Sequence, residues 1–112
     1  LSRNLSNKHA MQMLLTGDLI DAQNAYRMGL VNEVVDAEQL EMKTMELARK
    51  IASKSPLTVA IGKEAYYRQA ELTLGEAYDY TKEVMVRNLE AWDAQEGISA
   101  FIEKRHPVWC GK

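Results

Sequence analysis

Apolar residues recur at steps of three and four along most of the chain, which is the spacing of one face of an α-helix. The clearest such stripe contains Leu40, Leu47 and Ile51, and a later one contains Val84. β-branched residues gather only in residues 30–35, where valines permit a short strand or sheet edge. The pattern therefore predicts an all-α fold of about six short helices.

Capping residues set the expected bounds of these helices. Ser6, Asp21 and Ser55 each stand where a side-chain oxygen can accept a hydrogen bond from the first helical turn. In a capping box, the cap side chain and the third residue after it exchange hydrogen bonds, and such boxes are expected at Asp36 with Gln39, Thr73 with Glu76, and Asp93 with Glu96. The expected helices span residues 6–15, 21–28, 36–52, 55–71, 73–89, and 93 to 104 or 105.

The composition is that of a globular protein. Of 112 residues, 46% are hydrophobic and 27% are charged, so a modest core can form. The chain starts at Leu1 rather than Met, and we expect one domain or a piece of one. A net charge of −2, with acidic and basic residues interspersed, argues against nucleic acid or an anionic membrane as a partner. No apolar run reaches the roughly 20 residues that span a bilayer.

Few residues carry obvious chemistry. His9 and His106 lie far apart and have no carboxylate or cysteine at metal-ligand spacing, so no metal site is predicted. No glycine-rich loop follows a strand, which argues against a phosphate-binding or dinucleotide-binding loop. Cys110 is the only cysteine, which excludes an internal disulfide and favours a reducing compartment, such as the cytoplasm or the mitochondrion of a eukaryote. The carboxylates lie among lysines and arginines on predicted helices, the pattern of a solvated face.

One pair near the C-terminus is the best candidate for binding a ligand. Phe101 and Lys104 are three apart on the last predicted helix, so their side chains are neighbours, and Arg105 and His106 add positive charge just beyond. An aromatic face beside an ammonium suits a purine ring that carries a phosphate. In the alternative, Phe101 belongs to the core and the basic residues complement the negative end of the helix dipole. From these residues alone the alternative is the better hypothesis.

Several segments, in order, resemble the crotonase superfamily of enoyl-CoA hydratases and isomerases. The family has a series of three short motifs, which are matched here by LTGD at 15–18, IDAQNA at 20–25 and GLVNEVV at 29–35. The helix that follows these motifs in the family is matched by ARKIA at 48–52 and Ser55-Pro56, and the closing motif by EGISAFIEKR at 96–105. Residues 62–69 and 105–109 are similar to a branch called enoyl-CoA hydratase domain-containing proteins. The order and spacing agree, so the resemblance covers nearly the whole chain.

The resemblance implies that residues 1–112 form the C-terminal helical domain of an enzyme whose spiral α/β core lies upstream. In the family's reaction, two backbone N–H groups stabilise the enolate oxygen of a fatty-acyl-CoA thioester, and in the hydratases two glutamates activate water and deliver the proton. By the resemblance these groups precede Leu1. No catalytic residue is therefore expected in this chain.

The closing motif implies a contact with coenzyme A. In the hydratases of the family its aromatic residue and lysine reach the adenine and phosphate end of the coenzyme, often in a neighbouring subunit. Phe101 and Lys104 match these positions and become the expected CoA-binding residues. Coenzyme A would be part of the substrate, and no separate cofactor is expected.

The resemblance also implies subunit contacts, because the family forms trimers or paired trimers. Apolar stripes that face a core or a sister subunit in the family would be exposed in this chain, so we expect it to form a homo-oligomer. A second hypothesis belongs to another class of function. It holds that the chain is an independent helical module that binds a protein partner, with the family motifs kept only for packing.

Overall fold

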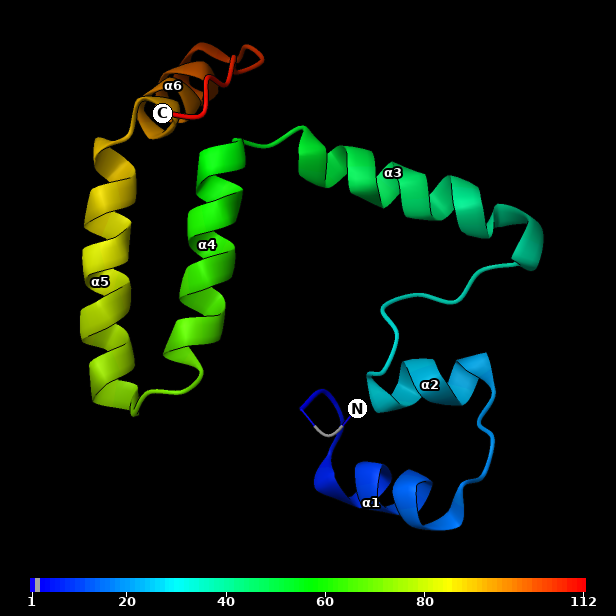
Figure 1. Ribbon diagram of the computed structural model, residues 1–112. Helices are drawn as coiled ribbons and strands as arrows, with labels where there is room; N and C mark the ends of the chain where they lie inside the picture. Colours follow the sequence, from blue (N-terminus) through cyan, green and yellow to red (C-terminus); the bar gives the residue numbers. More distant parts are fainter. Residues whose placement is uncertain (2) are drawn as a thin grey trace. The chain divides into compact units, whose positions relative to one another are not determined.

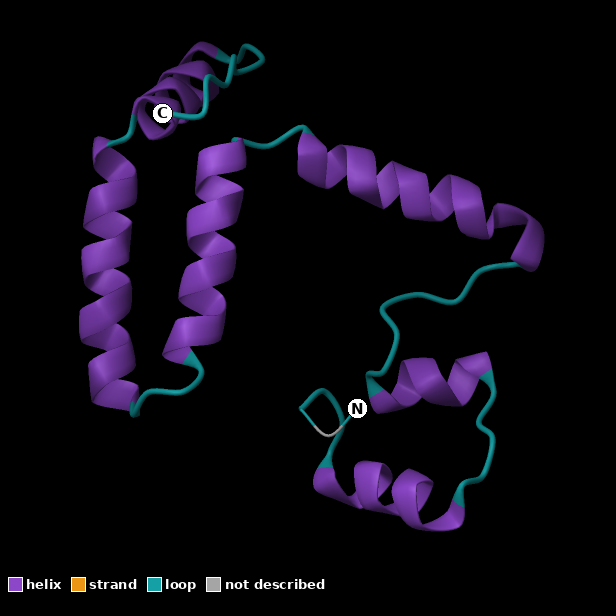
Figure 2. Ribbon diagram, in the orientation of Figure 1, coloured by secondary structure: helices purple, strands orange, loops and turns teal. Residues whose placement is uncertain are grey.

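The computed structural model describes residue 1 and residues 3–112, and this described part consists of helices and loops without a strand (Figure 1, Figure 2). The elements are α1 (Asn7–Thr16), α2 (Ala22–Met28), a 3-10 turn η1 (Ala37–Gln39), α3 (Leu40–Ala52), α4 (Pro56–Gln69), α5 (Leu74–Glu90) and α6 (Trp92–Glu103). The all-α prediction is confirmed, and residues 30–35 form bends and loop rather than the short strand that was possible there. No described helix is long and apolar enough to cross a membrane.

The structure divides into two compact units, Leu1–Met45 and Glu46–Lys112. In the first unit the predicted caps of α1 and α2 are both present. The hydroxyl of Ser6 accepts a hydrogen bond from the N–H of His9 at 3.4 Å, and the carboxylate of Asp21 accepts one from the N–H of Asn24 at 2.6 Å. α1 ends at Gly17 with φ 67°, and α2 ends at Gly29 with φ 83°. Glycine adopts positive φ without steric strain because it has no Cβ.

The first unit has a very small core. Its buried apolar residues are Leu5, Ala10 and Ala25. Larger apolar side chains of α1 are open to solvent, with Leu14 62% and Leu15 77% exposed. Burial of apolar area is the main stabilising contribution to folding. Within the described residues, the large apolar side chains of α1 make little of this contribution because they remain exposed.

In the second unit, α4 and α5 lie side by side as an antiparallel hairpin (Figure 1). α4 starts at the predicted cap, where the hydroxyl of Ser55 accepts a hydrogen bond from the N–H of Thr58 at 3.1 Å. α5 starts with the predicted capping box, in which the Glu76 carboxylate accepts from the N–H of Thr73 at 3.0 Å and from its hydroxyl at 2.7 Å. Local signals therefore place both helices correctly.

The capping box expected at Asp36 and Gln39 is wrong. The side chain of Asp36 makes no capping hydrogen bond. Instead, the N–H of Gln39 donates to the backbone carbonyl of Asp36 at 2.9 Å, which forms the 3-10 turn that precedes α3. The donor that the Asp36 side chain would have reached is already satisfied by the backbone, so a cap is not needed.

The capping box expected at Asp93 and Glu96 is also wrong, because Asp93 makes tertiary contacts. α6 starts at Trp92, one residue earlier than predicted, and Asp93 is only 1% exposed. Its carboxylate accepts a hydrogen bond from the hydroxyl of Ser55 at 2.5 Å. It also accepts from the N–H groups of Cys110 at 2.8 Å and Gly111 at 3.1 Å. One carboxylate therefore joins the start of α4, the start of α6 and the C-terminal tail, residues 105–112.

These hydrogen bonds decide the charge state of Asp93. Burial by itself raises the pKa of a carboxyl group, since a charge is poorly solvated away from water. The hydrogen bonds from Ser55, Cys110 and Gly111 favour the ionised form more strongly, and the pKa of Asp93 lies below its ordinary value of 3.8. Asp93 is therefore an anion at neutral pH.

A second contact of the tail involves the indole of Trp109. Its Nε1–H donates to the carbonyl of Ser53 at 2.9 Å, just before α4. Its ring lies against α6 at Gly97, where an added Cβ would come within 3.2 Å of the indole Cη2. Glycine at this position leaves room for the ring, so the tail packs closely on the helix.

We predict that Asp93→Asn lowers the melting temperature of the chain by roughly 5–10 °C at pH 7, because an amide group replaces one acceptor oxygen that faces buried donors. A lowered native pKa stabilises the fold above the ordinary pKa of 3.8, and this contribution disappears as the pH falls further. The difference between variant and wild type should therefore shrink below pH 3.8. Thermal unfolding followed by circular dichroism tests this, with the exposed Asp79→Asn as control. Equal losses in the two variants at pH 7 would contradict the role of Asp93.

A pair of glycine variants tests the packing of the tail. Gly62→Ala in α4 should stabilise the chain by about 0.5–1 kcal/mol, because alanine favours helix and the new methyl group meets nothing within 4 Å. Gly97→Ala gains the same helix propensity but must displace the Trp109 ring, so its stability should be lower than that of Gly62→Ala. Urea denaturation measures both. Equal gains would show that the indole does not pack against α6 in solution.

Candidate functional site

The C-terminal end of α6 presents Phe101 to solvent. Phe101 is 86% exposed, whereas its neighbour Ala100 is 1% exposed and forms part of the core of the second unit. The structure therefore does not support the alternative in which Phe101 is a core residue of this unit. An aromatic ring this exposed offers a face to a partner or ligand.

The helix ends one residue earlier than the predicted range, and Lys104 is its C-cap. Lys104 has φ 56° and ψ 38°, a left-handed conformation, and its N–H donates to the carbonyls of Ala100 and Phe101. The N–H of Arg105 then donates to the Ala100 carbonyl at 3.0 Å, which completes a Schellman-type end. Because Lys104 lies outside the helix, its side chain does not continue the helical face of Phe101. The expectation that helical spacing makes the two side chains neighbours is therefore wrong.

Lys104 is the one non-glycine residue with positive φ in the described part of the chain. For an L-residue with a Cβ this conformation costs roughly 1–2 kcal/mol. Residues held in such conformations are often found at functional sites, where the surrounding structure imposes them.

Arg105 is held on two sides by carboxylates. Its Nη1 and Nη2 donate to the two oxygens of Glu96 at 2.5 Å and 2.8 Å, and its Nε donates to Glu103 at 2.6 Å. Hydrogen bonds from Glu96 and Glu103 raise the pKa of the guanidinium further above its ordinary value. Arg105 thus does not add free positive charge beside Lys104, as its position in the sequence suggested.

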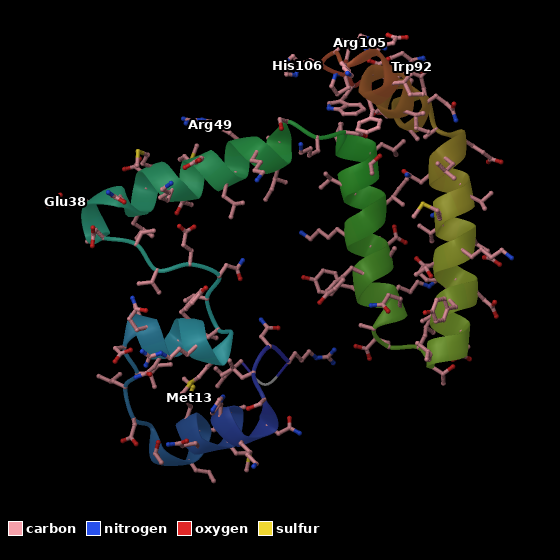
Figure 3. The ribbon with its side chains drawn as sticks, turned by 180° about the vertical axis from the view of Figure 1, so that it is seen from behind. Met13, Glu38, Arg49, Trp92, Arg105 and His106 are labelled. Carbon is pink, nitrogen blue, oxygen red and sulfur yellow. The ribbon has the colours of Figure 1, made fainter. Side chains whose placement is uncertain are left out.

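Glu96 links the last helix to the tail. Its side chain is 10% exposed, and besides Arg105 it accepts a hydrogen bond from the N–H of Val108 at 2.8 Å. The bonds from Arg105 and Val108 lower the pKa of Glu96 from 4.5 to about 2. Figure 3 shows Arg105 and His106 beside the end of α6. Glu96 therefore closes the turn that contains Lys104, which explains why it does not cap the helix.

A hollow of about 570 Å³ lies next to Phe101, between the start of α4, α6 and the tail. Apolar side chains form much of its lining, namely Val59, Ile98, Phe101 and Trp109, and Lys54 and Asn88 also border it. Hollows of a few hundred Å³ with apolar walls and few polar groups are typical of small-molecule sites. The end of α6 thus combines an apolar hollow with an exposed aromatic ring, and Lys104 follows as the C-cap of the helix.

The arrangement provides binding groups rather than acid or base groups. Asp93, which borders the hollow, and Glu96, which is bonded to Arg105, both accept several hydrogen bonds and have lowered pKa values. His106 is exposed and His9 is half-buried in the first unit. In the part of the chain that the structure describes, no three His, Cys, Asp or Glu side chains lie together as metal ligands do.

Three features of the site escaped prediction from the sequence. The contact between Ser55 and Asp93 joins residues 38 positions apart, and the indole of Trp109 reaches Ser53 over 56 positions. No local pattern marks such contacts. The left-handed Lys104 also had no signal, because lysine is seldom found there. A pattern of residues that vary together in many relatives could have found the first two.

Comparison with known proteins identifies the family. A family model described as Enoyl-CoA hydratase/isomerase matches residues 1–112. The mouse protein named enoyl-CoA hydratase domain-containing protein 3, mitochondrial, is 49% identical over 109 residues, which cover 97% of this chain and 36% of the mouse protein. Carnitinyl-CoA dehydratase of Escherichia coli is 39% identical over 105 residues, covering 90% of this chain and 40% of that enzyme. The chain thus spans well under half the length of these relatives.

Solved structures share the fold. The crystal structure of human enoyl-CoA hydratase domain-containing protein 3 matches with a TM-score of 0.93 and 47% identity, covering 96% of this chain and 43% of that one. An enoyl-CoA hydratase of Mycobacterium smegmatis also matches with a TM-score of 0.93, at 41% identity, with 96% of this chain and 42% of that chain covered. These matches confirm the crotonase-like helical fold and the branch suggested by residues 62–69 and 105–109. The chain belongs to the enoyl-CoA hydratase/isomerase family.

Proposed function

We propose that the chain supplies the coenzyme-contacting and subunit-contacting helices of an enzyme that acts on fatty-acyl-CoA thioesters. The observation that carries this proposal is the end of α6, where Phe101 is exposed and Lys104, the C-cap of the helix, takes a left-handed conformation. Family membership over residues 1–112 supports this function over an independent helical interaction module.

Phe101 and Lys104 would contact the nucleotide end of coenzyme A. The Phe101 ring would stack on the adenine, an interaction that suits an exposed aromatic face. The Lys104 ammonium would bind a phosphate as a point charge. Relatives of this chain are named as a hydratase and as a carnitinyl-CoA dehydratase, and a CoA thioester is common to the reactions these names imply. The coenzyme would thus be bound as part of the substrate.

The chemical step would take place outside residues 1–112. We infer an enolate whose oxygen is stabilised by two backbone N–H groups, with glutamates that transfer the protons, as the family resemblance implies. The lowered pKa values of Asp93 and Glu96 support this division of roles, because both carboxylates are weak bases and hold no proton to donate at neutral pH.

The apolar face of α3 would serve assembly. Leu40, Leu47 and Ile51 are each at least half exposed, and α3 has no buried residue. We propose that this face packs on the rest of the enzyme or on a sister subunit in a trimer or hexamer. The mitochondrial label in the names of the mouse and human relatives supports a mitochondrial location if the protein is eukaryotic. For a prokaryotic protein we propose a cytoplasmic location.

We predict that the purified 112-residue chain does not hydrate crotonyl-CoA, because the groups that stabilise the enolate are proposed to lie elsewhere. The loss of absorbance at the enoyl-thioester band measures hydration directly. A full-length relative, such as the human protein, assayed in parallel shows whether the assay detects the branch's activity. Turnover by the isolated chain that survives further purification would refute the proposed division of roles.

In the full-length protein, Lys104→Gly should raise KM for a CoA thioester roughly 5- to 30-fold with little change in kcat, because the contact is remote from the reacting carbonyl. Glycine keeps the left-handed turn without strain, so the change removes the lysine side chain and its charge while the backbone conformation is retained. Lys63→Ala, on an exposed position of α4, is the matched control for loss of one positive charge. If both variants had the KM of the wild type, Lys104 would have no part in the coenzyme site.

A further inference from the structure

We propose that Glu96 is a positioning residue of the coenzyme site, which acts by clamping Arg105 and thereby fixing the turn that carries Lys104. This inference rests on the proposed function, since it assigns a role toward the same ligand. Glu96 itself would not touch the coenzyme. Its side chain is 10% exposed, and its oxygens are bonded to Arg105 and Val108.

The clamp adds to the backbone hydrogen bonds that hold Lys104 in its left-handed conformation. The guanidinium of Arg105 is planar and binds both oxygens of Glu96, so its orientation is fixed as well as its distance. Because Arg105 follows Lys104 directly, fixing Arg105 restricts the backbone of Lys104. The Val108 N–H donates to the same carboxylate, so the segment that follows Arg105 is also held against α6.

The charges around the turn balance one another, so phosphate binding would depend on the position of the Lys104 ammonium. Lys104 and Arg105 together carry two positive charges, and Glu96 and Glu103 carry two negative ones, so the local sum is zero. A phosphate would gain little from the average field of this region. Lys104, however, has no acidic partner in the described part of the chain, whereas Arg105 has two. Binding would therefore depend on where the Lys104 ammonium is held.

One variant separates the effect of net charge from the effect of positioning, because the two predict opposite changes in the affinity for coenzyme A. Glu96→Gln removes a negative charge and leaves the turn with a net positive charge. If net charge controlled anion binding, the variant would bind coenzyme A more tightly. If Glu96 positions Lys104, the variant should bind more weakly, because an amide holds the guanidinium less firmly than a carboxylate does.

The experiment measures the dissociation constants of coenzyme A and of pantetheine, which lacks the nucleotide, by calorimetry with the full-length protein. Glu96→Gln should raise the constant for coenzyme A roughly 5- to 10-fold and leave that for pantetheine unchanged. Arg105→Lys is a second variant, in case the first folds poorly. It keeps the charge but loses the two-pronged contact, so it should act in the same direction.

A double-variant cycle with Lys104→Gly separates positioning from a general structural effect. When Lys104 is replaced by glycine there is no side chain to position, so adding Glu96→Gln should cause no further loss of affinity. Tighter binding by Glu96→Gln, equal weakening of pantetheine, or full additivity in the cycle would overturn the positioning role while the proposed function stands. Unchanged affinity in Lys104→Gly alone would instead refute the coenzyme site itself, and the role of Glu96 with it.

Discussion

The second unit depends on a single buried carboxylate. Asp93 receives the Ser55 hydroxyl, which also caps α4, and two backbone N–H groups of the tail, so it connects segments that are far apart in the sequence. Within the described residues, no buried side-chain polar atom lacks a hydrogen-bond partner. The buried apolar side chains of this unit are few and small, so a directional polar contact has to define how α4, α6 and the tail meet.

The fold could be predicted wherever the cause was local. Ser6, Asp21 and Ser55 each cap a helix because the donor that they satisfy lies within the next turn. At the start of α5, Glu76 in the first turn accepts the N–H of Thr73 for the same local reason. Asp93 has the same local pattern, yet its oxygens are used by partners far along the chain, and a nearby sequence pattern contains no information about those partners. The same reasoning explains the wrong assignment of Glu96, whose partners are in the tail.

The site was predictable in its residues but not in its geometry. The resemblance of residues 96–105 to a family motif selected Phe101 and Lys104, while helical spacing alone favoured a core role for the ring. That role fails because Ala100, not Phe101, faces the core of the unit. The left-handed turn at Lys104 is closed by backbone hydrogen bonds to Ala100 and Phe101, which the sequence does not announce. A count of basic residues also treats Arg105 as free charge, although it is paired with Glu96.

The contact between the tail and Asp93 has a consequence for hydrogen exchange. Residues 107–112 form no helix or strand, and amide protons in such segments normally exchange rapidly with solvent. The N–H groups of Cys110 and Gly111, however, are bonded to a carboxylate that is almost completely buried. Their protons can exchange only when the tail leaves α6, so they should exchange as slowly as helical amides although the segment has no regular structure.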